Sequence, residues 1–204
     1  MPEETFLDVI RGIMNSGSVF GLFLQVLPVT LLVGLIYSLY ELIRNKEENV
    51  IRKIIKALFV CYLTGLINLV IVPANFWLGV FDGILYGWWN EVGPFFSPGY
   101  FNLIPSLFKW LSGTITLGTW VKQMLIGNFL MFIPLGVFLP FVTERINRRN
   151  IVKVAVFIPL IIEVFQLTVG RSFDMDDLMC NFIGVIAGFW FVSWVKDRKI
   201  TNTD

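Results

Sequence analysis

The sequence predicts an all-α integral membrane protein, and three observations support this prediction. The chain has 204 residues, of which 56% are hydrophobic and 16% aromatic. Its mean hydropathy is +0.74. Its charged residues are confined to short segments between long uncharged runs, a pattern typical of proteins that span a membrane several times. The net charge of +1 gives no indication of a nucleic-acid partner.

Five apolar segments are long enough to cross the bilayer as helices, since about 20 residues span its hydrocarbon core. In chain order they are Val19–Tyr40, Ile54–Val80, Met124–Val142, Ile151–Val169 and Leu178–Val195. The second segment is long and contains Pro73 near its end, so we expect the helix to stop or tilt there.

The basic residues gather in alternate connections between these segments. They are Arg44, Lys46, Arg52, Lys53 and Lys56 after the first segment, Arg145, Arg148, Arg149 and Lys153 after the third, and Lys196, Arg198 and Lys199 after the fifth. The remaining ones, Arg11, Lys109, Lys122 and Arg171, fall on the opposite side. Because cytoplasmic connections are enriched in Lys and Arg, the N-terminus is predicted outside and the C-terminus inside.

Two further segments complete a single membrane domain over residues 1–204. Within residues 1–17, the stretch Thr5–Met14 places Phe6, Val9, Ile10 and Ile13 on one helical face, which predicts a helix lying in the outer interface. Residues 81–120 form an outer linker that is rich in Trp, Phe and Tyr and interrupted by Pro94, Pro98 and Pro105. Aromatic side chains favour the headgroup region, so we expect an interfacial or re-entrant segment over the outer face.

Polar residues gather where the fourth and fifth segments meet. They are Glu163, Gln166, Arg171, Asp174, Asp176, Asp177 and Asn181. At ~1.5 Å per residue, Glu163 and Gln166 lie roughly 5–10 Å below the outer end of the fourth segment, and Asn128 in the third lies at a comparable depth. The polar groups of three helices therefore converge in the outer leaflet. They line no path to the cytoplasm, which argues against a channel or pump.

Glu163 and Gln166 are spaced i, i+3 and share one helix face. An acid at this depth is a candidate general acid, general base or cation ligand. The alternative is a structural Glu that pairs with Arg171 or is hydrogen-bonded across helices. Arg171 is a candidate for holding a phosphate or carboxylate. Its alternative role is to neutralise Glu163 or the nearby Asp residues, and the two roles can coexist.

Asp174, Asp176 and Asp177 precede the fifth segment, where acids cap helices well. Three acids within four residues exceed what capping requires, so a Mg²⁺ or Ca²⁺ site is a second interpretation. Carboxylate spacing alone is weak evidence, and we assign no metal ligand. The chain contains no histidine, which excludes His-based acid/base catalysis and His-ligated zinc.

An ordered set of motifs in the second half of the chain resembles the VanZ-like family. The set comprises Asn102-Leu-Ile-Pro105, then Asn128-x-x-x-Phe132-x-Pro134-x-Gly136, Glu163-x-x-Gln166, Arg171, Asp174-x-Asp176-Asp177, Asn181 and Gly184. Each motif is weak by itself, but the order is specific. The resemblance covers residues 100–195. It departs from the family pattern at Ser106, where the family usually has Phe.

The resemblance implies a multi-pass protein of the bacterial plasma membrane that lowers susceptibility to teicoplanin-like lipoglycopeptides. The expected partner is a membrane lipid or lipid-linked cell-wall ligand, or the antibiotic itself. In an enzymatic version, a hydrolase or transferase without His, the catalytic residues are Glu163, Arg171 and Asp177, and the substrate-binding residues are Asn128, Gln166, Asn181 and Asp174. In a binding version the same groups recognise an amphiphile without turnover. In a structural version they only join helices.

Overall fold

The computed structural model describes residues 5–116 and 118–201, so the first four residues of the predicted interfacial segment lie outside the described residues. In chain order the elements are α1 (Phe6–Met14), α2 (Val19–Arg44), α3 (Val50–Val70), α4 (Phe76–Tyr86), the 3-10 helix η1 (Trp89–Glu91), β1 (Tyr100–Asn102), α5 (Ser106–Leu111), α6 (Thr119–Val142), α7 (Ile151–Gln166), β2 (Ser172–Asp174) and α8 (Met175–Thr201). The predicted all-α membrane fold is confirmed.

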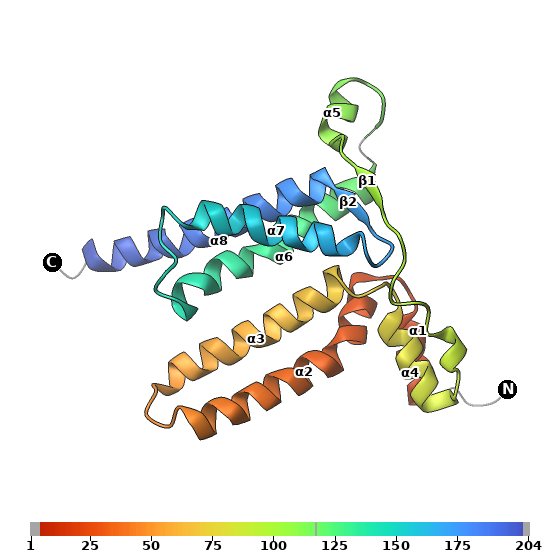
Figure 1. Ribbon diagram of the computed structural model, residues 1–204, viewed down its shortest axis with the longest axis horizontal. Coiled ribbons are helices and arrows are strands. Elements are labelled where there is room, and N and C mark those ends of the chain that lie inside the picture. Colours follow the sequence, from red (N-terminus) through yellow and green to blue (C-terminus); the bar gives the residue numbers. More distant parts are fainter. Residues whose placement is uncertain (1–4, 117, 202–204) are drawn as a thin grey trace.

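Four of the described helices, α2, α3, α6 and α8, are long and apolar enough to cross a membrane. α7 has 16 residues, or about 24 Å at ~1.5 Å per residue, and is shorter than the ~30 Å hydrocarbon core. The five-span count therefore stays a prediction. The connections α2–α3 and α6–α7 and the C-terminal end of α8 lie at one end of the molecule, and α1, α4, β1 and α5 at the other (Figure 1). This arrangement agrees with the segregation of basic residues in the sequence.

The predicted second span, Ile54–Val80, is too long, whereas the expectation that the helix stops or tilts near Pro73 is confirmed. α3 ends at Val70, and a separate helix, α4, begins at Phe76. Pro73 has no backbone N–H to continue the helical ladder, and Asn75 adopts the left-handed conformation with φ 62°. Turns use Asn in this conformation at little steric cost. The chain therefore turns at the end of α3, and the apolar residues of α4 form a separate helix that does not continue along the axis of α3.

The outer linker is fastened to the connection between α7 and α8 by a short parallel sheet, which the sequence analysis did not predict. β1 pairs with β2 in the register Tyr100↔Ser172, Phe101↔Phe173 and Asn102↔Asp174. Just before β1, the amide of Gly99 donates to Leu167 O at 2.8 Å. A Cβ at Gly99 would lie 2.0 Å from Arg171 O, so only glycine fits this approach. α5 then projects away from the helices (Figure 1).

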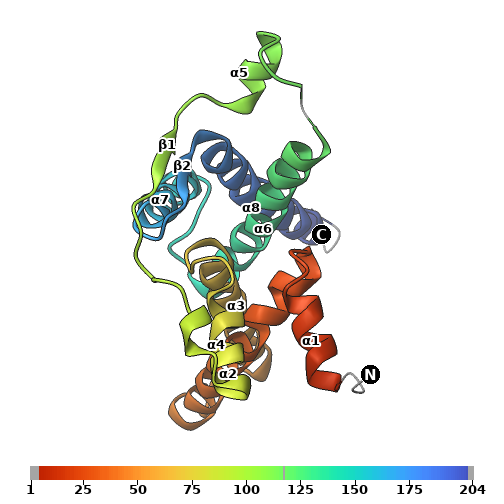
Figure 2. The same cartoon turned by 90° about the vertical axis from the view of Figure 1, so that its right-hand side faces the viewer.

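The hydrophobic core lies where α6 and α8 cross, with α3 and α7 beside them (Figure 2). Phe132, Leu135 and Val185 are almost fully buried there. A Cβ at Gly184 would lie 2.4 Å from Phe129 O, and one at Gly188 2.1 Å from Ile133 O. Two glycines four residues apart therefore let the backbones of α6 and α8 touch, as Gly-x-x-x-Gly motifs commonly do in membranes.

α1 is the predicted amphipathic helix, and an ion pair joins it to α4. Its N-terminus carries a capping box, in which Thr5 accepts from the Asp8 amide and Asp8 accepts from the Thr5 amide. Arg11 donates to both carboxylate oxygens of Asp82, at 2.7 and 2.9 Å. Asp82 is buried within α4, and its hydrogen bonds raise the pKa of Arg11. α1 and α4 are thereby held side by side at one end of the bundle (Figure 1).

Candidate functional site

The polar cluster consists of the seven predicted site residues, which the structure places near the junction of α6, α7 and α8. Its members are Asn128, Glu163, Gln166, Arg171, Asp174, Asp177 and Asn181. Glu163 has no exposed surface. One carboxylate oxygen, Oε2, accepts from the Asp174 amide at 2.9 Å. The other oxygen, Oε1, is buried and has no hydrogen-bond partner among the described residues.

Gln166 and Arg171 hold the end of α3. Gln166 Nε2 donates to Val70 O at 2.8 Å. Arg171 NH1 donates to Leu69 O at 2.9 Å and to Val70 O at 3.1 Å. The last carbonyls of a helix have no partner within the helix, so these two side chains act as a C-terminal cap supplied from elsewhere in the chain.

The guanidinium of Arg171 also balances the acids of the polar cluster. Burial lowers its pKa from the ordinary value, and the charges of Asp177 and Glu163 offset part of that effect. Arg171 stays protonated under any physiological condition because a guanidinium loses its proton only in strongly alkaline solution. No ion pair within 4.0 Å joins it to an acid among the described residues. The alternative of a direct pair with Glu163 is therefore wrong for this geometry.

Asp174 caps the start of α8, as one sequence interpretation proposed, whereas Asp176 accepts from the start of α5 instead. Asp174 Oδ1 accepts from the Asp176 amide at 2.9 Å and so caps the start of α8. Its Oδ2 accepts from Asn102 Nδ2 at 2.8 Å, and Asn102 Oδ1 in turn accepts from Lys109 Nζ at 3.0 Å. Both oxygens of Asp176 accept from the Ser106 amide, at 3.0 and 2.8 Å, at the start of α5.

Asp177 and Asn181 face the same junction from α8. Asn128 Nδ2 on α6 donates to Asp177 Oδ1, which confirms that the Asn128 side chain belongs with these groups. Asn181 is 3% exposed, and its Oδ1 has no hydrogen-bond partner in the part of the chain that the structure describes. The polar cluster thus contains two buried acceptor oxygens without donors, Glu163 Oε1 and Asn181 Oδ1.

The acids divide between several partners instead of converging on one point. Asp176 faces α5, Asp174 faces Asn102 and the α8 amide, and Asp177 faces Asn128. Within residues 5–116 and 118–201 there is no group of three His, Cys, Asp or Glu side chains placed to hold a metal ion. The Mg²⁺ or Ca²⁺ interpretation therefore gains no support from the geometry.

Two polar residues that connect to the polar cluster were not predicted as site residues from the sequence. Asn102 and Lys109 lie in the outer linker and connect to the polar cluster through Asp174. Asn102 was part of the family motif, which was a usable signal. Its partner lies 72 positions away, at the matching register of the β1–β2 pair. No local pattern indicates such a pairing.

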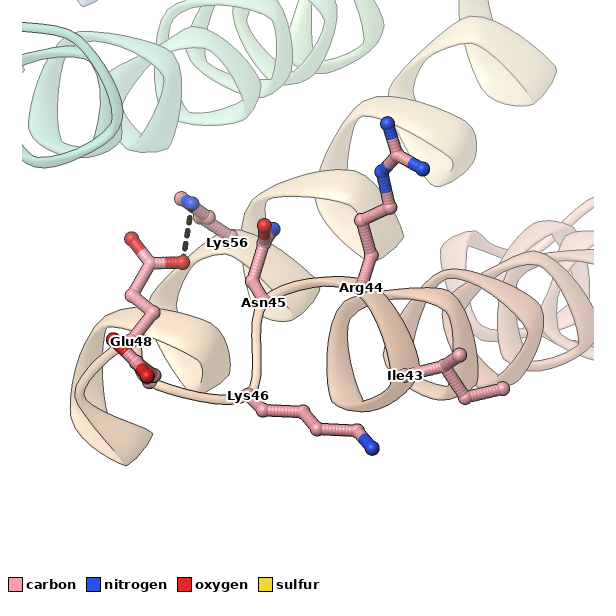
Figure 3. A pocket seen from close by; sticks show the side chains of 7 residues that line it. Ile43, Arg44, Asn45, Lys46, Glu48 and Lys56 are labelled. Carbon is pink, nitrogen blue, oxygen red and sulfur yellow. Dashed lines mark hydrogen bonds and ion pairs between the residues drawn. The ribbon is translucent and has the colours of Figure 1, made fainter.

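Two hollows lie outside the polar cluster. One, of about 570 Å³, surrounds the α2–α3 turn and is lined by Ile43, Arg44, Asn45, Lys46, Glu47, Glu48 and Lys56. Lys56 Nζ donates to Glu48 at 2.6 Å and to the buried Glu41 at 2.9 Å. Arg44 and Lys46 extend away from the Lys56–Glu48 pair (Figure 3). These ion pairs stabilise the turn. The second hollow is apolar and lies between α2, α3 and α6.

The family can now be decided from comparison with known proteins. The VanZ/LLP1 family profile matches residues 59–196, more than half of the chain. The chain belongs to the VanZ/LLP1 family. The match runs from α3 into α8 and includes every residue of the polar cluster. The resemblance read from the ordered motifs is therefore confirmed, and the protein is a VanZ-like membrane protein. No curated protein and no solved structure matched this VanZ/LLP1 chain.

Proposed function

We propose that this VanZ/LLP1 protein lowers susceptibility to teicoplanin-like lipoglycopeptides in the bacterial plasma membrane. It does so by engaging a lipid-linked ligand of the cell envelope at the polar cluster, on the outer side. Membership of the VanZ/LLP1 family supports a role in lowering susceptibility to teicoplanin. The predicted topology, with basic connections at the opposite end, supports the outer position.

One observation carries the proposal, namely the pair of buried acceptors Glu163 Oε1 and Asn181 Oδ1. A buried acceptor without a donor costs about 1–3 kcal/mol. The cost is higher for a charged group, and low surrounding polarity increases it further. A protein that only needed helix contacts would be more stable with an apolar residue at position 181, whereas Glu163 also accepts from the Asp174 amide through Oε2. Both oxygens are shielded from the surface in this conformation, so a ligand rich in hydroxyl and amide N–H groups, such as the sugars and peptides of the envelope, donates to them when the helix junction opens.

The remaining groups of the polar cluster have defined roles in this proposal. Gln166 and Arg171 hold α3 against α7, and Asp174 holds the outer linker through Asn102. They position Glu163 and Asn181, while the positive charge of Arg171 balances an anionic headgroup. Asp177, held by Asn128, supplies a second acid beside Glu163. In a catalytic version Glu163 accepts or donates the proton.

Glu163→Gln tests the proposal because it keeps the shape of the side chain and removes the carboxylate. We expect teicoplanin susceptibility of expressing cells to return to that of cells without the protein. The matched control is Glu144→Gln, the same chemical change at a carboxylate that is 91% exposed. It should protect as the wild type does. Equal protection by Glu163→Gln at equal membrane abundance would rule out a role for this carboxylate.

Mass spectrometry of envelope lipids from the same strains separates catalysis from binding. A lipid-linked species that changes with the wild type, and not with Glu163→Gln, indicates turnover. An unchanged lipid profile together with an amphiphile that co-purifies with the wild type, and is lost from Glu163→Gln, indicates binding.

The capping roles of Asp174 and Asp176 and of Gln166 and Arg171 favour a second candidate, in which the polar cluster only joins helices. Abundance in the membrane distinguishes it. In the structural case Glu163→Gln and Asn181→Leu lower the amount of folded protein and reduce protection in the same proportion. In the proposed case Asn181→Leu preserves the fold and loses protection, because the buried acceptor has no structural partner to lose.

A further inference from the structure

The apolar hollow between α2, α3 and α6 is a cleft of about 580 Å³. Its lining comprises Val19, Phe23, Val26, Leu27 and Thr30 of α2, Cys61, Tyr62, Gly65, Leu66 and Leu69 of α3, and Gly127, Leu130, Met131 and Pro134 of α6. These three helices are all long and apolar enough to span a membrane. The cleft therefore opens within the part of the protein that faces lipid.

We propose that this cleft binds one acyl chain of an outer-leaflet lipid, with the lipid headgroup directed toward the polar cluster. The link to the headgroup rests on the proposed function, whereas the binding of the chain does not. The size fits, since ligand sites occupy roughly 300–1,000 Å³. The chemistry fits too, because the lining is apolar apart from the Thr30 and Tyr62 hydroxyls and the Cys61 thiol.

Hydrocarbon is the occupant that the surroundings favour. An apolar hollow does not hold water well, because a water molecule needs two to four polar partners. Tyr62 donates its hydroxyl to Met131 O at 2.8 Å. That bond occupies the Tyr62 hydroxyl proton, and the buried Thr30 hydroxyl is the remaining side-chain oxygen of the lining, which is fewer than the two to four partners that a water molecule needs. A hollow that opens laterally among spanning helices is in contact with acyl chains, which match its lining.

The cleft borders the polar cluster at the end of α3 and along α6. Leu69 belongs to both, since its side chain lines the cleft while its carbonyl accepts from Arg171 at 2.9 Å. On α6 the cleft residue Gly127 directly precedes Asn128, which donates to Asp177. One amphiphile can therefore place its acyl chain in the cleft and its headgroup at the polar cluster, because the residues that contact the two parts are neighbours.

Two glycines shape the cleft and give a direct way to close it. A Cβ at Gly127 would meet no atom within 4 Å, and one at Gly65 would meet only Thr30 Oγ1, at an ordinary contact distance of 3.6 Å. An added Cβ at either position therefore enters open space, and a larger side chain extends from there into the cleft. Gly127→Leu fills the cleft from α6, and Gly65→Leu fills it from α3.

Photocrosslinking of the full-length protein tests the proposal. The protein is reconstituted in phosphatidylglycerol–phosphatidylcholine vesicles that contain a phosphatidylglycerol with a diazirine in one acyl chain. After irradiation, labelled peptides are identified by mass spectrometry. We expect labels concentrated on Leu66, Leu69 and Met131. Gly127→Leu should lower labelling of these residues by about tenfold, equivalent to about 1.4 kcal/mol. Gly65→Leu provides the same measurement should Gly127→Leu insert poorly.

Gly12→Leu is the matched control, because a Cβ at Gly12 also meets no atom within 4 Å but lies on α1, away from the cleft. It should leave labelling unchanged. Labels spread evenly over the exposed faces of α2, such as Leu31 and Leu35, would overturn the proposal. So would cleft labelling that Gly127→Leu and Gly65→Leu leave intact.

Glu163→Gln separates this proposal from the proposed function. Cleft labelling and protection against teicoplanin are measured separately in this variant. If cleft labelling persists and protection is complete, the proposed function fails while the acyl-chain site stands. If labelling is diffuse while Glu163→Gln abolishes protection, the acyl-chain site fails and the proposed function stands.

Discussion

The α6–α8 crossing and the junction of α6 with α2 and α3 use the same residue, glycine, for opposite purposes. At the crossing, a Cβ on Gly136 would lie 2.0 Å from Val185 O, so the missing side chain lets two backbones touch. At the junction, a Cβ on Gly127 would touch nothing, so the missing side chain leaves a cleft. Both glycines belong to α6 and lie nine positions apart in the sequence.

The difference shows how packing is distributed in this bundle. Water does not drive spanning helices together, so their association depends on close van der Waals contact and interhelical hydrogen bonds. The crossing has backbone contact along Gly184 and Gly188. The junction has instead a polar link, the hydrogen bond from the Tyr62 hydroxyl of α3 to Met131 O of α6. The loosely packed junction is therefore where a ligand chain can enter without displacing a helix.

The largest expected effect belongs to Gly136→Ala at the crossing. Overpacking a tight core costs about 1–3 kcal/mol, and here the new Cβ meets backbone atoms that cannot turn aside. The free energy of unfolding in detergent should fall by at least the lower figure. An unchanged value would show that α6 and α8 are not held at this distance.

Arg171→Ala should have the next largest effect. Val70 O keeps its bond from Gln166, but Leu69 O loses its donor. Hydrogen bonds to charged groups contribute about 1.5–3 kcal/mol, and we expect the lower end of that range. Hydrogen exchange should accelerate in the last turn of α3. The control is Arg149→Ala, at an exposed arginine at the opposite end of the bundle. Equal exchange in both variants would contradict the capping role.

Gly127→Ala should stabilise the protein slightly, in contrast to Gly136→Ala. Alanine favours the helix over glycine by up to about 1 kcal/mol, and the added methyl group enters open space. Unfolding measured under the same conditions as for Gly136→Ala gives the comparison directly. A loss of stability would mean that the junction is closed in the membrane.

The smallest effect is expected for Tyr62→Phe, which removes the hydroxyl that donates to Met131 O. Interhelical hydrogen bonds in membranes contribute about 0.6 kcal/mol on average, so the loss in unfolding free energy should be near that value. Tyr40→Phe, at a tyrosine that is 54% exposed, is the matched control. A loss several times larger would make Tyr62 the main link between α3 and α6.

Hydropathy and amphipathic spacing predicted most helices, because they depend on residues close in sequence. The helix α1, predicted from the apolar face of Thr5–Met14, is an example. The predicted second span ran past the end of α3 because hydropathy stays high from α3 into α4, although Pro73 was a usable signal for the end of the helix. The left-handed turn at Asn75 was not predicted. The pairing of Arg11 with Asp82 was also missed, although a single acid in an apolar helix was a usable signal.

The sequence by itself determined the membrane class, the segregation of charges, the VanZ-like motifs and the residues of the polar cluster. Each of these depends on composition or on short spacings along a helix. Only the tertiary structure decided that Arg171 caps α3 instead of pairing with Glu163, and that Glu163 and Asn181 keep unpartnered oxygens. It also decided that Gly127 opens a cleft while Gly136 closes a contact. These outcomes depend on which helices lie opposite each other, and no spacing within one helix encodes that.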